Sequence, residues 1–184
     1  VKFFSWYAMF CYWEYITSSL SISVFHTTDQ ASEGFSKAQL LTGNLNGTYN
    51  IICFIVAFAL VPIAKKIGAK GVHFGALILG GLGLICIPYL NNVDVLFYVY
   101  NPFGESIAIS SIYLYSFGLG ISWASMMAMP YQLLAGSIPK EKQGVYMGIF
   151  NMFIVIPMAI QIFTMQFFVY DLLGKNPLNV IRLA

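Results

Sequence analysis

Long runs without a charged side chain constrain this chain more than any other feature. Its 184 residues hold nine Lys or Arg and seven Asp or Glu side chains. Four uncharged stretches are long enough to cross a bilayer, which takes about 20 mostly apolar residues: 38–64, 71–93, 106–139 and 143–170. Between Lys2 and Asp29 the only charged residue is Glu14. The sequence therefore predicts an all-α integral membrane protein with five spans: 3–25, 39–62, 71–90, 106–134 and 145–170.

The composition agrees with this interpretation. Hydrophobic residues make up 59% of the chain and charged residues 9%, whereas soluble domains carry roughly a quarter charged residues. No basic patch is dense enough to indicate nucleic-acid binding. The chain lacks a low-complexity linker, which predicts one continuous membrane domain over 1–184 with the lipid bilayer as its surroundings. It starts at Val1 rather than Met, and we expect both ends to be cuts in a longer protein.

The distribution of Lys and Arg predicts which side of the membrane each loop faces. Five spans place six basic residues on one side: Lys2, Lys65, Lys66, Lys70, Lys140 and Lys142. Three fall on the other side: Lys37, Lys175 and Arg182. Because cytoplasmic loops carry the excess of basic residues, the first side is predicted to be cytoplasmic. The outer segment 91–105 is rich in Asn, Tyr and Phe, and its aromatic residues suit a membrane interface.

Polar side chains line one face of four predicted spans. They are Glu14, Thr17, Ser18 and Ser21 in the first, Asn46, Tyr49, Asn50 and Cys53 in the second, Ser111, Tyr115, Gly118, Ser122 and Ser125 in the fourth, and Asn151 and Gln161 in the fifth. Lipid cannot satisfy such groups, so they face protein or water. The third span lacks a stripe, and its glycines suit close packing as an outer support. Single serines are better explained as contacts between helices, but four aligned stripes favour a polar pathway.

Glu14 is the strongest single candidate for chemistry, since it lies about halfway along the first span. A charge at mid-membrane costs about 2.5 to 3.5 kcal/mol even on the lenient insertion scale, so Glu14 is expected to be protonated, paired or hydrated. A carboxyl group kept protonated by desolvation can release and take up a proton as its surroundings change. The alternative is a structural carboxyl bonded to Trp13, Tyr15 or another helix, and we favour the functional interpretation.

Metal, cofactor and enzyme sites are not indicated. His26 and His73 are predicted at opposite faces of the membrane. The three cysteines fall in three different spans without CxxC spacing, which favours neither zinc nor a disulfide framework. A membrane enzyme acting on lipid or glycan would need an acid–base or nucleophilic pair at one depth, and the sequence offers none. The prediction is a protein without enzymatic activity, metal or cofactor.

The segment from Trp123 to Pro157 resembles a known family. It contains Pro130-Tyr131, Ile138-Pro139, the run Gly-Val-Tyr-Met-Gly-Ile-Phe-Asn over 144–151, and Ile-Val-Ile-Pro over 154–157. This combination resembles the sucrose/maltose-type proton symporters of the major facilitator superfamily, near the glycoside–cation symporter group. Residues 65–70, Lys-Lys-Ile-Gly-Ala-Lys, resemble the second, degenerate copy of the superfamily's basic inter-helix motif, without its acidic residue.

The resemblance implies the C-terminal half of a twelve-helix carrier, helices seven to eleven, without the N-terminal half and the last helix. In that superfamily helix nine is peripheral and the other four line the pathway. The implied activity is proton-coupled uptake of a mono- or disaccharide by alternating access, in a membrane we expect to be the bacterial cytoplasmic membrane. Open alternatives are a carrier of another small solute, such as a nucleoside, drug or peptide, and a transporter-fold sensor or assembly protein without flux.

The implied site residues follow from these stripes and the resemblance. Substrate contacts are predicted at Trp13, Glu14, Asn50, Tyr115, Trp123, Asn151 and Gln161, with the two tryptophans as stacking surfaces. Glu14 is also the predicted proton-coupling residue. Gating is predicted in two inner loops at Lys65, Lys66, Gly68, Lys70, Pro139 and Gly144. The family often has Gln directly after the proline at 157, where this chain has Met158, and Gln161 is expected to replace it one turn later.

Overall fold

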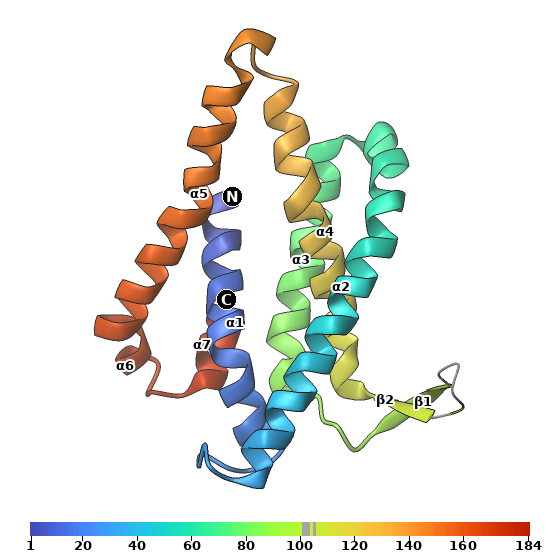
Figure 1. The fold of residues 1–184 in the computed structure, drawn as a ribbon, viewed down its shortest axis with the longest axis vertical. Coiled ribbons are helices and arrows are strands. Elements are labelled where there is room, and N and C mark those ends of the chain that lie inside the picture. Colours follow the sequence, from blue (N-terminus) through green and yellow to red (C-terminus); the bar gives the residue numbers. More distant parts are fainter. Residues whose placement is uncertain (101–103, 105) are drawn as a thin grey trace.

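In the part of the chain that the structure describes, five long helices run back and forth along the longest axis (Figure 1). The computed structural model describes residues 1–184 apart from 101–103 and 105. The long helices are α1 (Lys2–Ser23), α2 (Glu33–Ile67), α3 (Ala69–Cys86), α4 (Leu114–Ala135) and α5 (Gln143–Thr164). The α2–α3 and α4–α5 connections lie toward one end of the molecule, and the α1–α2 and α3–α4 connections lie toward the other. The prediction that the chain is mainly α-helical is thereby confirmed.

Shorter elements lie between and after these helices. Within the described residues they are η1 (Ile87–Tyr89), β1 (Val95–Tyr100), β2 (Ser106–Ser110), η2 (Ser111–Tyr113), η3 (Lys140–Lys142), a π-helical segment η4 (Met165–Val169), α6 (Tyr170–Leu172) and α7 (Pro177–Leu183). The helix α7 was not predicted. The Asn176 side chain accepts a hydrogen bond of 2.9 Å from the Leu178 N–H, and Pro177 occupies the first turn, so both usual start signals are present.

Among the described residues, four helical stretches are long and apolar enough to cross a membrane: Glu33–Ile67, Ala69–Tyr89, Ser111–Ala135 and Lys140–Leu172. The chain therefore has the helices of a multi-pass membrane protein. At 22 residues α1 is also long enough, but it is less apolar than these four. Polar residues such as Glu14 and Thr17 lower its hydropathy, and the predicted first span stays a prediction.

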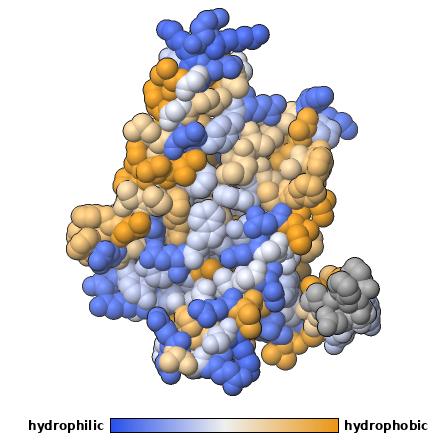
Figure 2. All heavy atoms as spheres, in the orientation of Figure 1, coloured by the Kyte–Doolittle hydropathy of each residue, from blue (hydrophilic) through white to orange (hydrophobic). Residues whose placement is uncertain are grey.

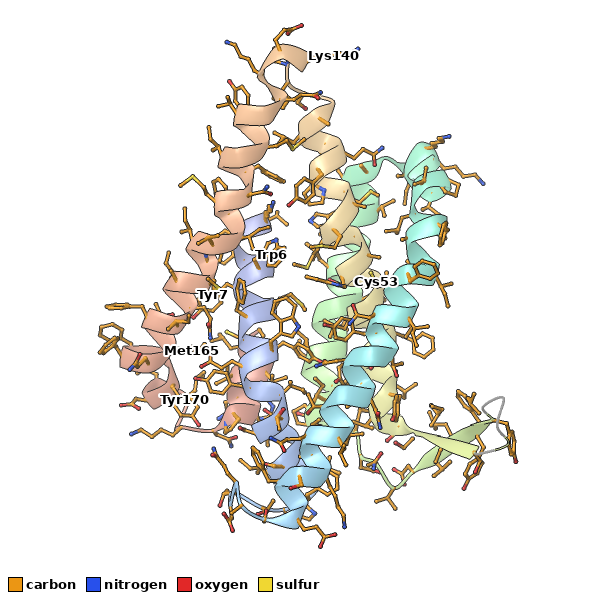
Figure 3. All side chains as sticks on the ribbon, viewed as in Figure 1. Trp6, Tyr7, Cys53, Lys140, Met165 and Tyr170 are labelled. Atoms are coloured by element: carbon orange, nitrogen blue, oxygen red, sulfur yellow. The ribbon has the colours of Figure 1, made fainter. Side chains whose placement is uncertain are left out.

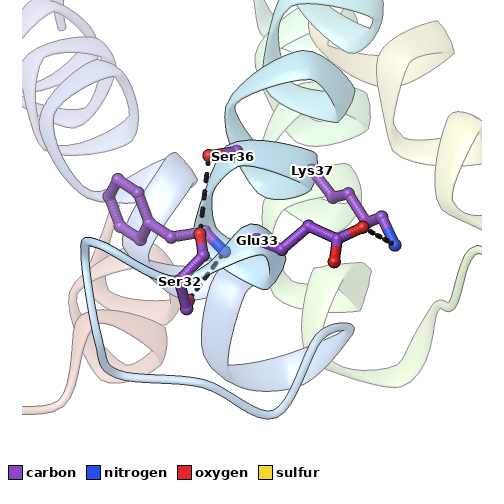
Figure 4. Close-up of polar contacts among 5 residues, drawn as sticks. Ser32, Glu33, Ser36 and Lys37 are labelled. Atoms are coloured by element: carbon purple, nitrogen blue, oxygen red, sulfur yellow. Dashed lines mark hydrogen bonds and ion pairs between the residues drawn. The ribbon is translucent and has the colours of Figure 1, made fainter.

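The start of α2 shows how local chemistry sets a boundary. The helix begins at Glu33 rather than at residue 39, because Ser32 caps it. The Ser32 hydroxyl oxygen accepts a hydrogen bond from the Phe35 N–H at 3.1 Å, and the Lys37 ammonium lies 2.8 Å from the Glu33 carboxylate (Figure 4). The other end of α2 is set by Gly68, whose φ of 81° ends one helix and lets α3 begin at Ala69.

The predicted fourth span begins too early in the sequence. Residues 106–110 form the strand β2, which pairs antiparallel with β1, and α4 starts only at Leu114. The reason is local: Ser106, Ala108 and Ser110 alternate with isoleucines, and 95–100 is a run of β-branched, aromatic and leucine side chains. Both patterns favour strands, and pairing satisfies the backbone groups that a helix would otherwise satisfy.

Close helix packing is concentrated between α3 and α4. A Cβ on Gly80 would lie 2.6 Å from the Ser122 Cβ, and a Cβ on Gly118 would collide with the Leu79 carbonyl. Gly83 also faces α4, but Gly75 and Gly81 face open space and Gly71 meets only Ile67. The expectation that all the glycines of the third span mediate packing is therefore only partly right. Exposed side chains such as Phe74 and Leu82 cover the other side of α3.

The helix α1 connects two groups of helices. On one side it packs against α5, where the Tyr7 hydroxyl lies 2.8 Å from the Thr164 hydroxyl. On another it packs against α4, where the Trp6 and Trp123 rings lie 5.5 Å apart. Figure 3 shows Trp6 and Tyr7 directed to different sides of α1. The side chains of the candidate site lie on these two sides of α1.

Candidate functional site

A carboxyl–amide hydrogen bond joins α1 to α5. The Gln161 Nε2 donates to the Glu14 Oε2 at 2.7 Å. The Gln161 side chain is 1% exposed, whereas Glu14 is exposed at the surface of the helix group. Two of the residues predicted from sequence are thus direct neighbours, although 147 positions separate them. The structural alternative for Glu14, a bond to another helix, and its candidate role in a site are both compatible with this contact.

The Glu14 carboxyl group opens into a polar cavity of about 420 Å³. Its lining includes Ser18 and Ser21 of α1, together with Tyr170 and Lys175 near the end of the chain. The cavity lies toward the end of the molecule that carries the α1–α2 connection, since Thr28 and Gln30 contribute to its lining. The lining offers several polar groups that can bond to water, so the cavity suits a hydrated environment for Glu14.

Aromatic rings form a cluster between α1 and α4. The Trp13 and Trp123 centroids are 5.4 Å apart with an interplanar angle of 83°, and Trp6 and Phe10 complete the group. Such edge-to-face pairs are a preferred aromatic geometry and fix the orientation of the rings. Both predicted stacking residues are partly exposed and lie in contact with one another. Because Trp13 precedes Glu14, the cluster and the carboxyl group lie at one depth.

A network of hydroxyl and amide groups links α1, α2 and α4. The Tyr12 hydroxyl donates to the Asn46 Oδ1 at 2.7 Å, and it lies 3.0 Å from the Tyr115 hydroxyl. A tyrosine hydroxyl has one proton, so in this arrangement Tyr115 donates to Tyr12. On the next face of α1 the Trp13 Nε1 donates to the Tyr49 hydroxyl at 3.1 Å. The predicted residue Tyr115 is 1% exposed and therefore holds the network rather than facing a cavity.

The remaining predicted substrate contacts lie apart from this group. Asn50 is exposed on α2, and its amide donates to the Asn46 carbonyl of the same helix at 2.8 Å. Asn151 is exposed on α5, and its Oδ1 accepts from the Tyr131 hydroxyl at 2.8 Å. The structure therefore brings together Glu14 with Gln161 and Trp13 with Trp123, and it places the two asparagines elsewhere.

Sequence reasoning left Tyr12, Asn46 and Tyr49 out of the predicted site. Asn46 and Tyr49 belong to the polar stripe of the second span, so a signal for them existed. Tyr12 gave a weaker signal, because Ile16 and Leu20 follow on the same face of α1 and make that face look like ordinary core. Figure 2 shows hydrophilic residues along the middle of this side of the molecule, with hydrophobic residues on both flanks.

The predicted gating residues gather at the end of the molecule opposite the Glu14 cavity opening. Lys65, Lys66 and Lys70 flank Gly68 at the α2–α3 connection, and all three lysines are exposed. Pro139 precedes η3 and Gly144 lies in the first turn of α5. Figure 3 shows Lys140 at this end and Tyr170 toward the other.

The described part of the chain has no group of three or more His, Cys, Asp or Glu side chains that could hold a metal ion. His73 instead bonds across the α3–α4 contact, where its Nδ1 lies 3.0 Å from the Ser125 hydroxyl. Cys11 is buried, Cys86 is exposed and Cys53 lies between these extremes. Comparisons with protein-family models, curated proteins and solved structures give no match for this chain.

Proposed function

We propose that this chain belongs to a secondary active transporter that takes up a sugar together with a proton by alternating access. In this proposal the chain supplies most of the C-terminal half of the carrier, and the substrate binds between it and the N-terminal half. The proposal rests on the resemblance of residues 123–157 to sugar–proton symporters. The structural observation that supports it best is the hydrogen bond between Glu14 and Gln161.

Through that hydrogen bond, proton binding at Glu14 would change how firmly α5 is attached to α1. An ionised Glu14 accepts a charge-assisted bond from Gln161, and such bonds contribute about 1.5 to 3 kcal/mol against about 0.5 to 1.5 for neutral pairs. Protonation of Glu14 would therefore weaken the attachment of α5 to α1. The helix α5 contains Pro157 and runs into the π-helical segment η4, and both features are common where helices bend. A proton at Glu14 would thus favour movement of α5 relative to α1.

The aromatic cluster supplies a surface that suits a sugar. Ligand sites combine aromatic walls with a few oriented polar groups. Trp13 and Trp123 provide the rings, and the carboxyl of Glu14, the residue after Trp13 in α1, provides a hydrogen-bonding group. Substrate near Trp13 would lie next to Glu14, so binding and proton loading would occur at neighbouring residues.

Uptake of labelled sucrose, maltose and glucose tests the proposal in vesicles that hold the full-length protein, with and without a pH gradient. The variant is Glu14→Gln, and the control is Glu33→Gln, the same change at an exposed carboxylate outside the site. We expect gradient-driven accumulation of one sugar that Glu14→Gln abolishes and Glu33→Gln retains. If uptake changed neither with the pH gradient nor in Glu14→Gln, Glu14 would have no role in proton coupling. Absence of uptake by folded protein would favour another solute or a sensor without flux.

A further inference from the structure

The hairpin formed by β1 and β2 has two chemically different faces. Its register pairs Phe97 with Ile109 on one face, and Tyr98 with Ala108 and Tyr100 with Ser106 on the other. Because side chains alternate along a strand, Val99 shares the face of Phe97. One face is therefore aliphatic and phenyl, and the other carries tyrosine hydroxyls and small residues. Residues 95–100 carry no charged side chain.

The hairpin is exposed along all of β1. Phe97 is 52% exposed, Val99 45% and Tyr100 72%. A strand of this composition with both faces exposed to water would leave much apolar surface hydrated, which is unfavourable. We therefore expect another molecule to cover the aliphatic face, and the neighbouring residues indicate what kind of molecule it is.

Exposed apolar side chains also lie at the helix ends next to the hairpin in the sequence. Ile85, at the end of α3 before the hairpin, is 50% exposed, and Leu114 and Phe117, just after it, are 50% and 54% exposed. They lie on two of the stretches that are long and apolar enough to cross a membrane. Lipid that covers these residues reaches the base of the hairpin.

Hydrogen bonds fix the base of the hairpin to the helix group. The Ser111 N–H donates to the Asp94 carbonyl at 2.9 Å, the Asn91 N–H donates to the Ser111 hydroxyl at 3.1 Å, and the Ser110 hydroxyl donates to the Asn92 Oδ1 at 2.9 Å. From this base the strands extend sideways, across the direction of the helices (Figure 1). A hairpin held in this direction at a helix end lies along the plane of a membrane.

We propose that the β1–β2 hairpin lies in the interfacial layer of the membrane as a second, non-spanning contact with lipid. The face with Phe97, Val99 and Ile109 is directed to the acyl chains, and the face with Tyr98 and Tyr100 is directed to the headgroups. Aromatic residues, tyrosine among them, are enriched at this depth. The unpaired edges of a two-stranded sheet require water, which the interfacial layer contains and the hydrocarbon core does not. This inference does not depend on what the protein transports.

Spin-label accessibility tests the proposal on the full chain in vesicles of phosphatidylcholine and phosphatidylglycerol. Cys11, Cys53 and Cys86 are replaced by Ala, and single nitroxide labels are attached at Phe97→Cys and Tyr98→Cys. Oxygen concentrates in lipid and a nickel chelate stays in water. We expect an oxygen-to-nickel collision ratio several-fold higher at 97 than at 98, and the same order for Val99→Cys against Tyr100→Cys.

Two further labels provide reference values. Phe54→Cys lies on an exposed apolar face of α2, and Glu33→Cys lies at an exposed helix start. The label at 97 is expected to approach the value at 54, and a ratio equal to that at 33 would place the hairpin in water and overturn the proposal. Low collision rates with both reagents at 97 and 98, with dipolar broadening between chains, would also overturn it, because a second copy would then cover the strands. Size-exclusion profiles identify variants that fail to fold.

Discussion

At the scale of single residues, the Tyr12 hydroxyl is a useful site to test because its hydrogen bonds join α1 to two other helices. Tyr12→Phe removes both bonds and leaves the buried Tyr115 hydroxyl without its acceptor. We expect a loss of stability of about 1 to 3 kcal/mol, the cost of an unsatisfied buried group. Tyr115→Phe removes only one bond, and its cost is expected near 1 kcal/mol. Reversible unfolding in detergent, followed by circular dichroism, measures both.

The control for these variants is Tyr146→Phe, the same chemical change at an exposed position of α5. Its stability is expected to match that of the unmodified protein. The double variant Tyr12→Phe/Tyr115→Phe completes a cycle, and its cost is expected to be less than the sum of the single costs because the two hydroxyls bond each other. Additive costs would contradict the proposed hydrogen bond.

The residues of the candidate site were more predictable than their partners. Polarity and aromatic character within long apolar stretches predicted Glu14, Gln161, Trp13 and Trp123 as candidates. Their pairing depends on how α1 packs between α5 and α4, which helical spacing along a single chain does not determine. Tyr12 was missed for a related reason. A tyrosine among apolar residues looks like an ordinary core residue in the sequence, and only the packed structure shows its partners on α2 and α4.

At the scale of elements, the paired glycines Gly80 and Gly81 allow a matched test of the α3–α4 contact. Gly80→Ala places a Cβ 2.6 Å from the Ser122 Cβ, so the helices must separate, at a cost of about 1 to 3 kcal/mol. Gly81→Ala meets nothing within 4 Å. It makes the same change in helix propensity and is expected to be neutral or slightly stabilising. Thermal unfolding of the two variants in one detergent measures the difference, and equal midpoints would exclude a tight contact at Gly80.

The start of α2 provides a second test at this scale. Ser32→Ala removes the cap from the Phe35 N–H and is expected to cost about 1 kcal/mol. Lys37→Ala removes an exposed ion pair with Glu33, and such pairs contribute between roughly 0 and 1 kcal/mol. We therefore expect hydrogen exchange in the first turn of α2 to accelerate in the Ser32 variant and to change little in the Lys37 variant. The reverse order would show that charge rather than capping holds this turn.

Helix existence was predictable from the sequence and helix boundaries were less so. Uncharged stretches located the cores of all four apolar spans, since the bilayer imposes one length and one chemistry. The strand β2 was predicted as helix because hydropathy does not distinguish 106–110 from the span that follows. Only pairing with β1 makes the strand favourable, and that pairing depends on 95–100 folding back beside it.

At the scale of the whole molecule, the number of spans depends on whether α1 crosses the membrane. Hydropathy alone underrates this helix, because many of its polar groups have partners within the protein: Glu14 bonds to Gln161, Thr17 bonds to Thr42, and Ser19 bonds to the Tyr15 carbonyl. The Lys2 ammonium, 3.4 Å from the centre of the Phe150 ring, packs against α5 through a cation–π contact. A helix of 22 residues measures about 33 Å, slightly more than a hydrocarbon core of about 30 Å. We therefore expect α1 to span.

Labelling from outside the cell decides between five spans and four. In a background without Cys11, Cys53 and Cys86, single cysteines replace Val1, Glu33 and Lys140, which are all exposed. A membrane-impermeant maleimide is expected to label Glu33→Cys in intact cells, and Val1→Cys and Lys140→Cys only after permeabilisation. This order follows if α1 crosses and the lysine-rich end is cytoplasmic. Labelling of both Val1→Cys and Glu33→Cys in intact cells would leave α1 on the outer side as a non-spanning helix. The Glu14 carboxyl would then lie outside the hydrocarbon core, and its proposed role in proton coupling would lose its physical basis.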